Sequence, residues 1–129
     1  MPKSNLEANT PLVLICLPWP NRFLSPNARL HFREKAQWTK AARGTGFLAA
    51  REVDLQLPRT GALELDLVFC PPDRKRRDAD NVLAALKGYI DGIFQWAETD
   101  DTRIKRIVID WGEITPGGAV YVSVFPEAQ

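Results

Sequence analysis

Apolar residues alternate with other residues between positions 63 and 70, and this segment constrains the fold more than any other. The alternating side chains are Leu63, Leu65, Leu67 and Phe69. Because successive side chains of a strand point to opposite faces of a sheet, a period of two predicts a strand with one buried face. This is the clearest strand in the chain, and a turn containing Pro58 and Gly61 precedes it.

A helix is predicted after this strand, because the hydrophobic period changes from two to steps of three and four. The residues at this spacing are Leu83, Leu86, Ile90, Ile93 and Ala97. Such spacing gathers the apolar side chains on one face of a helix, which is typical of a helix packed on a core. Asp80 or Asn81 is expected to cap its first turn.

Four further segments complete the predicted elements. Residues 12–17 form a continuous apolar run that predicts a central strand buried on both faces. Residues 32–54 are rich in Ala, Lys, Arg and Glu and predict a helix, which Gly44 and Gly46 are expected to split or bend. Residues 104–111 and 119–125 predict two final strands, joined by a turn at Gly117 and Gly118.

The elements therefore follow the order strand, helix, strand, helix, strand, strand. We expect class α+β or α/β, with a mixed sheet of four or more strands and two main helices, and strand order is left open. The 129 residues suffice for one domain. Residues 1–10 are polar and predict a flexible arm, which leaves residues 11–129 for the domain.

The most informative functional feature is a basic run that leads directly into aspartates at the start of the second helix. Basic residues occupy positions 74–77, and Asp78 and Asp80 follow. Basic side chains bind a phosphate backbone, but carboxylates beside them would repel it unless a divalent cation is present. Since the formal net charge is only +1, DNA affinity must come from local charge separation. The pattern predicts a nuclease.

Three aspartates are expected to hold Mg²⁺. Asp78 and Asp80 are two positions apart, and an extended segment would point both to one side. Asp100 and Asp101 follow the same helix, and a short return path could bring them beside the first pair. Mg²⁺ prefers a few carboxylate oxygens and keeps several waters. The sequence therefore predicts a metal site and leaves open whether Asp100 joins it.

Lys87 is the candidate for stabilising charge on the phosphate. On a helix it shares one polar stripe with Asp80 and Asp91, although it lies seven residues beyond Asp80. An ordinary exposed pair between Lys87 and Asp91 is an equal alternative. Helix capping likewise competes with metal binding for the aspartates before the helix, and a solvated loop competes with DNA binding for residues 74–77.

Other residues offer little catalytic chemistry. His31 is the only histidine, which argues against a histidine metal site or a histidine–serine triad. Trp19 lies between two prolines and is interpreted as a packing residue rather than as a base-stacking one. Cys16 and Cys70 are expected to be buried, reduced thiols. No segment reaches the length of a membrane span and the first residues lack an apolar signal, so we expect a cytoplasmic protein.

Three segments together resemble the RusA-type Holliday junction resolvases, dimeric Mg²⁺-dependent endonucleases of bacteria and prophages. The segments are residues 17–21, Leu-Pro-Trp-Pro-Asn, residues 73–81, Asp-Arg-Lys-Arg-Arg-Asp-Ala-Asp-Asn, and residues 100–104, Asp-Asp-Thr-Arg-Ile. The resemblance implies metal-binding aspartates at Asp78, Asp80 and Asp101. Members commonly carry a catalytic lysine where this chain has Ala84, and we expect Lys87, one turn further on, to replace it. The side chains expected to contact DNA are Arg74, Lys75, Arg76, Arg77 and Asn81.

The resemblance implies a homodimer that resolves four-way DNA junctions in recombination and repair. Two active sites suit this reaction, because it takes two symmetric nicks in opposing strands. Two alternatives remain open. The chain could be a non-catalytic DNA-binding module in which the aspartates only cap the helix, or a nuclease for other branched or single-stranded nucleic acids.

Overall fold

The computed structural model describes residues 13–127, so the expected arm at residues 1–10 lies outside the described residues. The elements are β1 (Val13–Pro18), η1 (Arg22–Leu24), α2 (Phe32–Glu52), β2 (Leu63–Cys70), α3 (Ala79–Ala85), α4 (Lys87–Trp96), η2 (Asp101–Arg103), β3 (Ile104–Trp111) and β4 (Ala119–Pro126). The predicted order of strands and helices is confirmed, except that the second helix is divided into α3 and α4.

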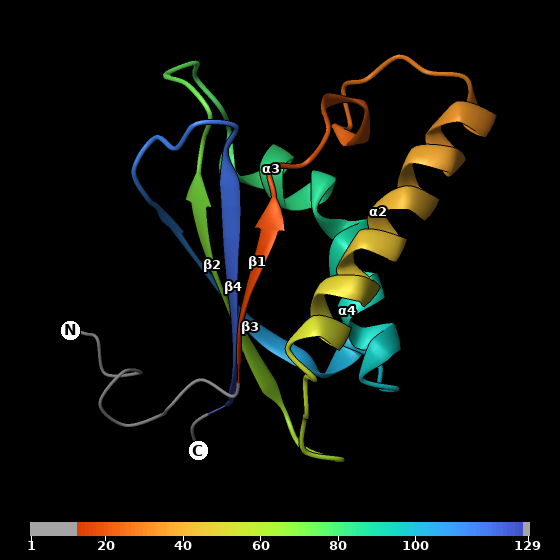
Figure 1. Ribbon diagram of the computed structural model, residues 1–129, viewed down its shortest axis with the longest axis vertical. Coiled ribbons are helices and arrows are strands. Elements are labelled where there is room, and N and C mark those ends of the chain that lie inside the picture. Colours follow the sequence, from red (N-terminus) through yellow and green to blue (C-terminus); the bar gives the residue numbers. More distant parts are fainter. Residues whose placement is uncertain (1–12, 128–129) are drawn as a thin grey trace.

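The four strands form one mixed sheet in the order β1-β4-β2-β3 (Figure 1). Strand β4 runs antiparallel to both β1 and β2, whereas β2 and β3 are parallel. Parallel neighbours need a crossover connection, and α3 with α4 provides it. The predicted α+β class with a four-stranded mixed sheet is confirmed.

Helices α2 and α4 cover one face of the sheet (Figure 1). The alternation that predicted β2 is realised there, since Leu65, Leu67 and Phe69 are each at most 1% exposed. They are buried with residues of the neighbouring strands and of the α3–α4 segment. This core includes Ile15, Leu17, Val120, Val122, Val124, Leu86, Ile90, Ile93 and Phe94. Burial of this apolar surface is the main force that joins the helices to the sheet.

Strand β1 was predicted to be central and buried on both faces, and this prediction is wrong. It pairs with β4 alone and lies at the edge of the sheet. Ile15 and Leu17 are buried, but Leu14 is 58% exposed and Cys16 is exposed as well. The physical reason is that helices cover one face of the sheet, so a continuous apolar run buries only every second side chain.

The second helix breaks at Leu86, which ends α3 and precedes α4. Leu86 is fully buried, so the break lies against the core. Helix α3 begins one residue after Asp78, which takes the N-cap position without a side-chain hydrogen bond to the helix. The prediction that Asp80 or Asn81 caps the helix is therefore wrong, because both lie within its first turn.

Helices α2 and α4 approach each other closely through glycine. A Cβ on Gly46 would lie 2.0 Å from the Tyr89 carbonyl oxygen, and a Cβ on Gly92 would lie 2.0 Å from the Arg43 carbonyl oxygen. Any side chain at either position would therefore force the two backbones apart. Helix α2 runs without interruption from Phe32 to Glu52, so the prediction that its glycines split it is wrong. Gly46 instead permits the helix crossing.

Candidate metal and nucleic-acid site

Two cavities lie on different faces of α3. The Trp19 cavity, of about 650 Å³, is lined by Trp19, Pro20, Asn21, Arg22, Ser25, Pro72, Arg76, Arg77, Asp78, Asn81, Val82 and Ala85. The Lys87 cavity, of about 520 Å³, is lined by Leu65, Asp80, Leu83, Ala84, Lys87, Ile90, Asp101, Ile104 and Ile107. Most of the predicted site residues are thus divided between two neighbouring hollows, whereas Arg74, Lys75 and Asp100 line neither.

The Lys87 cavity brings together charged side chains from three elements. Asp80 comes from α3, Lys87 from the first residue of α4, and Asp101 from η2. Lys87 Nζ lies 2.5 Å from Asp101 Oδ2 and 2.8 Å from Asp91 Oδ1. The contact with Asp91 follows from the spacing of four along α4. The contact with Asp101 forms because the chain after α4 returns toward the start of that helix.

These contacts stabilise the charged forms of the lysine and of one carboxylate. The hydrogen bond to Asp101, followed by that to Asp91, raises the pKa of Lys87 above its ordinary value. The same hydrogen bond from Lys87 lowers the pKa of Asp101, against an opposing effect of burial. At neutral pH the cavity therefore holds the Lys87 ammonium group beside the Asp101 carboxylate.

Replacing Lys87 by methionine is expected to lower the free energy of unfolding by no more than about 1 kcal/mol at neutral pH, because the ion pairs are largely solvent-exposed. The lysine contribution is lost as pH rises through its raised pKa, and that of Asp101 is lost as pH falls through its lowered pKa. Urea unfolding across pH measures this difference. A difference between the two proteins that stays constant into strong acid would contradict the assignment.

Asp78 and Asp80 do not point into one cavity. The backbone of Asp78 is extended, whereas Asp80 lies within the first helical turn, so the two carboxylates leave α3 in different directions. The expectation that an extended segment aligns them is wrong, because the helix already begins at Ala79. The Asp80 carboxylate accepts a hydrogen bond from the Asn81 N–H at 3.0 Å. The Asp78 side chain makes no hydrogen bond within residues 13–127, so no such bond fixes its rotamer.

The carboxylates of the Lys87 cavity suit a hard divalent cation. Mg²⁺ is commonly held by one or two carboxylates, with waters and substrate phosphates completing its coordination. Asp80 and Asp101 form such a pair in one cavity. Among residues 13–127, however, no group of three or more Asp, Glu, His or Cys side chains is arranged to hold an ion. Asp100 caps η2 through a 2.9 Å hydrogen bond from the Thr102 N–H, which occupies part of its carboxylate.

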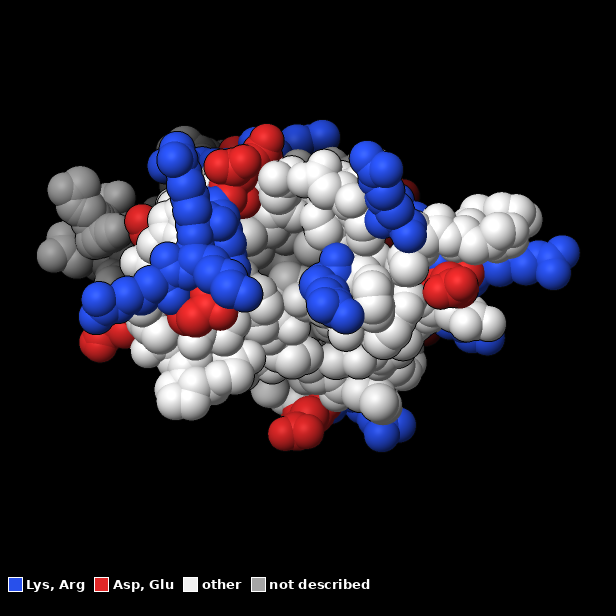
Figure 2. Space-filling view, turned by 90° about the horizontal axis from the view of Figure 1, so that it is seen from above, with Lys and Arg blue, Asp and Glu red and all other residues white. Residues whose placement is uncertain are grey.

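The basic loop between β2 and α3 contains two kinds of side chain. Arg74, Lys75 and Arg76 are exposed and form no ion pair within the described part of the chain. Arg77 differs, because its guanidinium pairs with the Asp73 carboxylate at 2.9 Å and also donates to the carbonyls of Asp73 and Lys75. Figure 2 looks down on this end of the molecule and shows Lys and Arg side chains around a hollowed surface.

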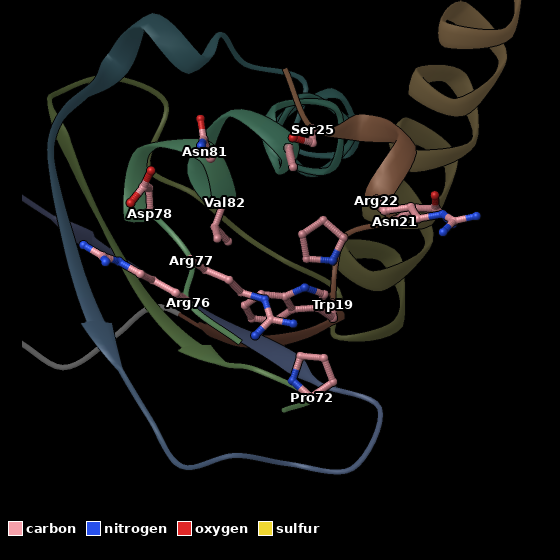
Figure 3. A pocket seen from close by; sticks show the side chains of 12 residues that line it. Trp19, Asn21, Arg22, Ser25, Pro72, Arg76, Arg77, Asp78, Asn81 and Val82 are labelled. Atoms are coloured by element: carbon pink, nitrogen blue, oxygen red, sulfur yellow. The ribbon is translucent and has the colours of Figure 1, made fainter. Parts of the chain in front are cut away.

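The Trp19 cavity is assembled from three segments (Figure 3). They are the turn after β1, the loop before α3, and α3 itself. Trp19 meets Phe69 edge to face, with ring centroids 6.4 Å apart, so it packs against the core as expected while also lining the cavity. Sequence reasoning did not identify Arg22, Ser25 or Pro72 as site residues. The prolines on either side of Trp19 signalled a turn but carried no information about the loop that the turn would meet.

No helix among residues 13–127 combines the length and the apolar character needed to cross a membrane. No family model matches the chain. It is similar to an uncharacterized protein of Xylella fastidiosa, with 38% identity over 113 residues that cover 85% of this chain and 74% of that protein.

Proposed function

We propose that this chain, which belongs to the same protein family as the Xylella fastidiosa protein, is a Mg²⁺-dependent endonuclease that nicks four-way DNA junctions in the bacterial cytoplasm. The observation that carries the proposal is that Asp80, Asp101 and Lys87 line one cavity, next to a helix that begins directly after an exposed basic loop. The resemblance of residues 73–81 and 100–104 to the RusA-type resolvases supports the choice of substrate.

The exposed basic residues would bind the DNA backbone. Arg74, Lys75 and Arg76 have no internal ion-pair partner in the described chain, so phosphates can approach them without breaking an existing pair. Their position at the start of α3 would guide a phosphate towards the neighbouring cavity. Arg77 was also expected to contact the DNA backbone. Its guanidinium would mainly stabilise the loop instead, through its contacts with Asp73 and with the Lys75 carbonyl.

Asp80 and Asp101 would hold the metal ion, with Asp78 as a proposed third ligand that reaches it by rotating its unbonded side chain. A bound Mg²⁺ would supply positive charge to the scissile phosphodiester. Lys87 Nζ, like an ordinary lysine amine, would be protonated at neutral pH and would stabilise negative charge rather than accept a proton. It would thereby serve in place of the lysine that this chain lacks at Ala84.

Two protomers would act together, because two nicks in opposing strands require two sites related by symmetry. A homodimer is therefore part of the proposal. Its interface should leave the basic loops of both protomers accessible to the same junction.

The proposal is tested by incubating the protein with a synthetic four-way junction, with Mg²⁺ or with EDTA, in competition with flap and linear duplex DNA. We expect paired nicks that require Mg²⁺ and a preference for the junction. Metal-independent binding without cleavage would instead support a non-catalytic DNA-binding module. Preferential cleavage of flaps or single strands would support a nuclease for other nucleic acids.

A further inference from the structure

We infer that the Trp19 cavity receives one unstacked base of the DNA strand at the junction branch point. The inference rests on the proposed function and names the part of the substrate that this cavity takes. The volume of about 650 Å³ lies in the usual range for a small-molecule site and is ample for one nucleotide. The cavity combines a flat aromatic wall, apolar sides and a few polar groups, which is the chemistry that binds an extruded base.

The flat surface is a stack of Arg77 on Trp19. The Arg77 guanidinium carbon lies over the Trp19 ring, 5.3 Å from its centre, and Figure 3 shows both side chains among those that line the cavity. Phe69 supports the indole from the core, and Asp73 with two loop carbonyls fixes the guanidinium. Bases stack on aromatic rings and on guanidinium planes alike. Because both groups are held in place before DNA arrives, stacking costs little additional ordering.

The cavity suits a base better than a phosphate. Arg77 already directs its donors at Asp73 and at the Lys75 carbonyl, so these donors are not available to a phosphate. The remaining walls include Pro20, Pro72 and Val82, which offer apolar contact to a ring. The Asn81 amide also lines the cavity and can meet the edge of a base.

A single DNA strand that places a base in the Trp19 cavity can also reach the Lys87 cavity. Asn81 and Val82 line the first hollow, whereas Asp80, Leu83 and Ala84 line the second, so α3 alone separates them. The diameter of a helix is roughly 10 Å, which a single strand spans within a few nucleotides. Arg76, exposed and lining the Trp19 cavity, is placed to hold a phosphate beside the inserted base. A base inserted here would fix the register of the strand at the cutting site.

The experiment is a thermodynamic cycle in EDTA that pairs Trp19→Ala with removal of a base. The Trp19→Ala variant and the protein that keeps Trp19 both carry Asp80→Asn, so that no DNA is cut. Binding is measured by fluorescence anisotropy. The junctions carry an abasic residue at each branch-point nucleotide in turn. We expect Trp19→Ala to weaken binding of the intact junction by roughly tenfold to a hundredfold, the usual value of base stacking. For one abasic junction the same substitution should change affinity less than twofold.

Two further variants make the cycle decisive. Arg77→Lys keeps the charge but removes the planar group, so it should show the same loss and the same dependence on the base, even if Trp19→Ala does not fold. Trp96→Ala is the matched control, because Trp96 also meets a phenylalanine, Phe47, edge to face, at 5.6 Å, but lines neither the cavity nor the hollow beside the basic loop. Its effect should be equal on intact and abasic junctions.

The base site would be overturned if Trp19→Ala and Arg77→Lys each weakened binding of every abasic junction as much as binding of the intact junction. The cycle is independent of cleavage, so the two claims can fail separately. A protein that shows the base dependence but never cuts with Mg²⁺ retains the base site and loses the nuclease proposal. A protein that cuts junctions without the base dependence retains the nuclease proposal and loses the base site.

Discussion

Replacing Asp80 by asparagine is expected to lower Mg²⁺-dependent junction cleavage by about three orders of magnitude while junction binding survives. Asp80 lines the Lys87 cavity with Asp101, and its removal leaves a single carboxylate there. Metal stabilisation of transition-state charge contributes several kcal/mol, and each 1.4 kcal/mol is about tenfold in rate. Binding should stay equal or tighten, because the lost charge repels phosphates. Single-turnover cleavage and anisotropy measure the two quantities.

The matched control is Asp110→Asn, which removes the same charge from an exposed position on β3. Asp110 neighbours Val68 in the parallel pair, outside both cavities. This control should cut at the rate of the unmodified protein, and Asp101→Asn should behave like Asp80→Asn. Cleavage by Asp80→Asn at the rate of the control would remove Asp80 from the metal site.

Replacing Gly92 by alanine is expected to lower the free energy of unfolding by about 3 kcal/mol, at the upper end of the cost of overpacking. The new Cβ would meet the Arg43 carbonyl oxygen at 2.0 Å and the Phe47 amide nitrogen at 2.8 Å. Both are backbone atoms of α2, so they cannot move aside by a change of side-chain rotamer. The two helices would have to separate and lose part of their buried contact. Urea unfolding followed by circular dichroism measures the change.

Gly44→Ala is the control. Gly44 lies on α2, the helix that Gly92 of α4 contacts, but nothing lies within 4 Å of its added Cβ. It should raise the free energy of unfolding by up to about 1 kcal/mol, through higher helix propensity alone. If Gly92→Ala and Gly44→Ala changed stability in the same direction and by similar amounts, the close helix crossing would be refuted.

The elements of this fold could be predicted from periodicity because each pattern depends on local geometry. The alternation through Leu65 and Leu67 identified β2, and the steps of three and four identified the face that buries Leu86 and Ile93. The edge position of β1 could not be predicted, because it depends on strand order and on which sheet face the helices cover. The break at Leu86 was not predicted either, although Gly88 lies two residues beyond it.

The candidate site was predictable where residues are close in sequence. The spacing of four suggested the contact of Lys87 with Asp91. The separation of Asp78 from Asp80 was not predictable, since it depends on the single residue at which α3 begins. The Trp19 cavity was missed for a different reason. It forms where the turn after β1 meets the loop before α3, and these segments come together through the order of the strands in the sheet, which the sequence did not reveal.

Asp80 and Asp101 are proposed to hold a divalent ion in the Lys87 cavity. Titration of the isotope-labelled chain with substoichiometric Mn²⁺, followed by nuclear magnetic resonance, tests this claim directly, because a paramagnetic ion broadens the signals of nearby residues. We expect broadening to begin at the residues that line this cavity and to be reversed by excess Mg²⁺. Broadening that begins at residues remote from α3 and η2, or that Mg²⁺ does not reverse, would contradict the claim.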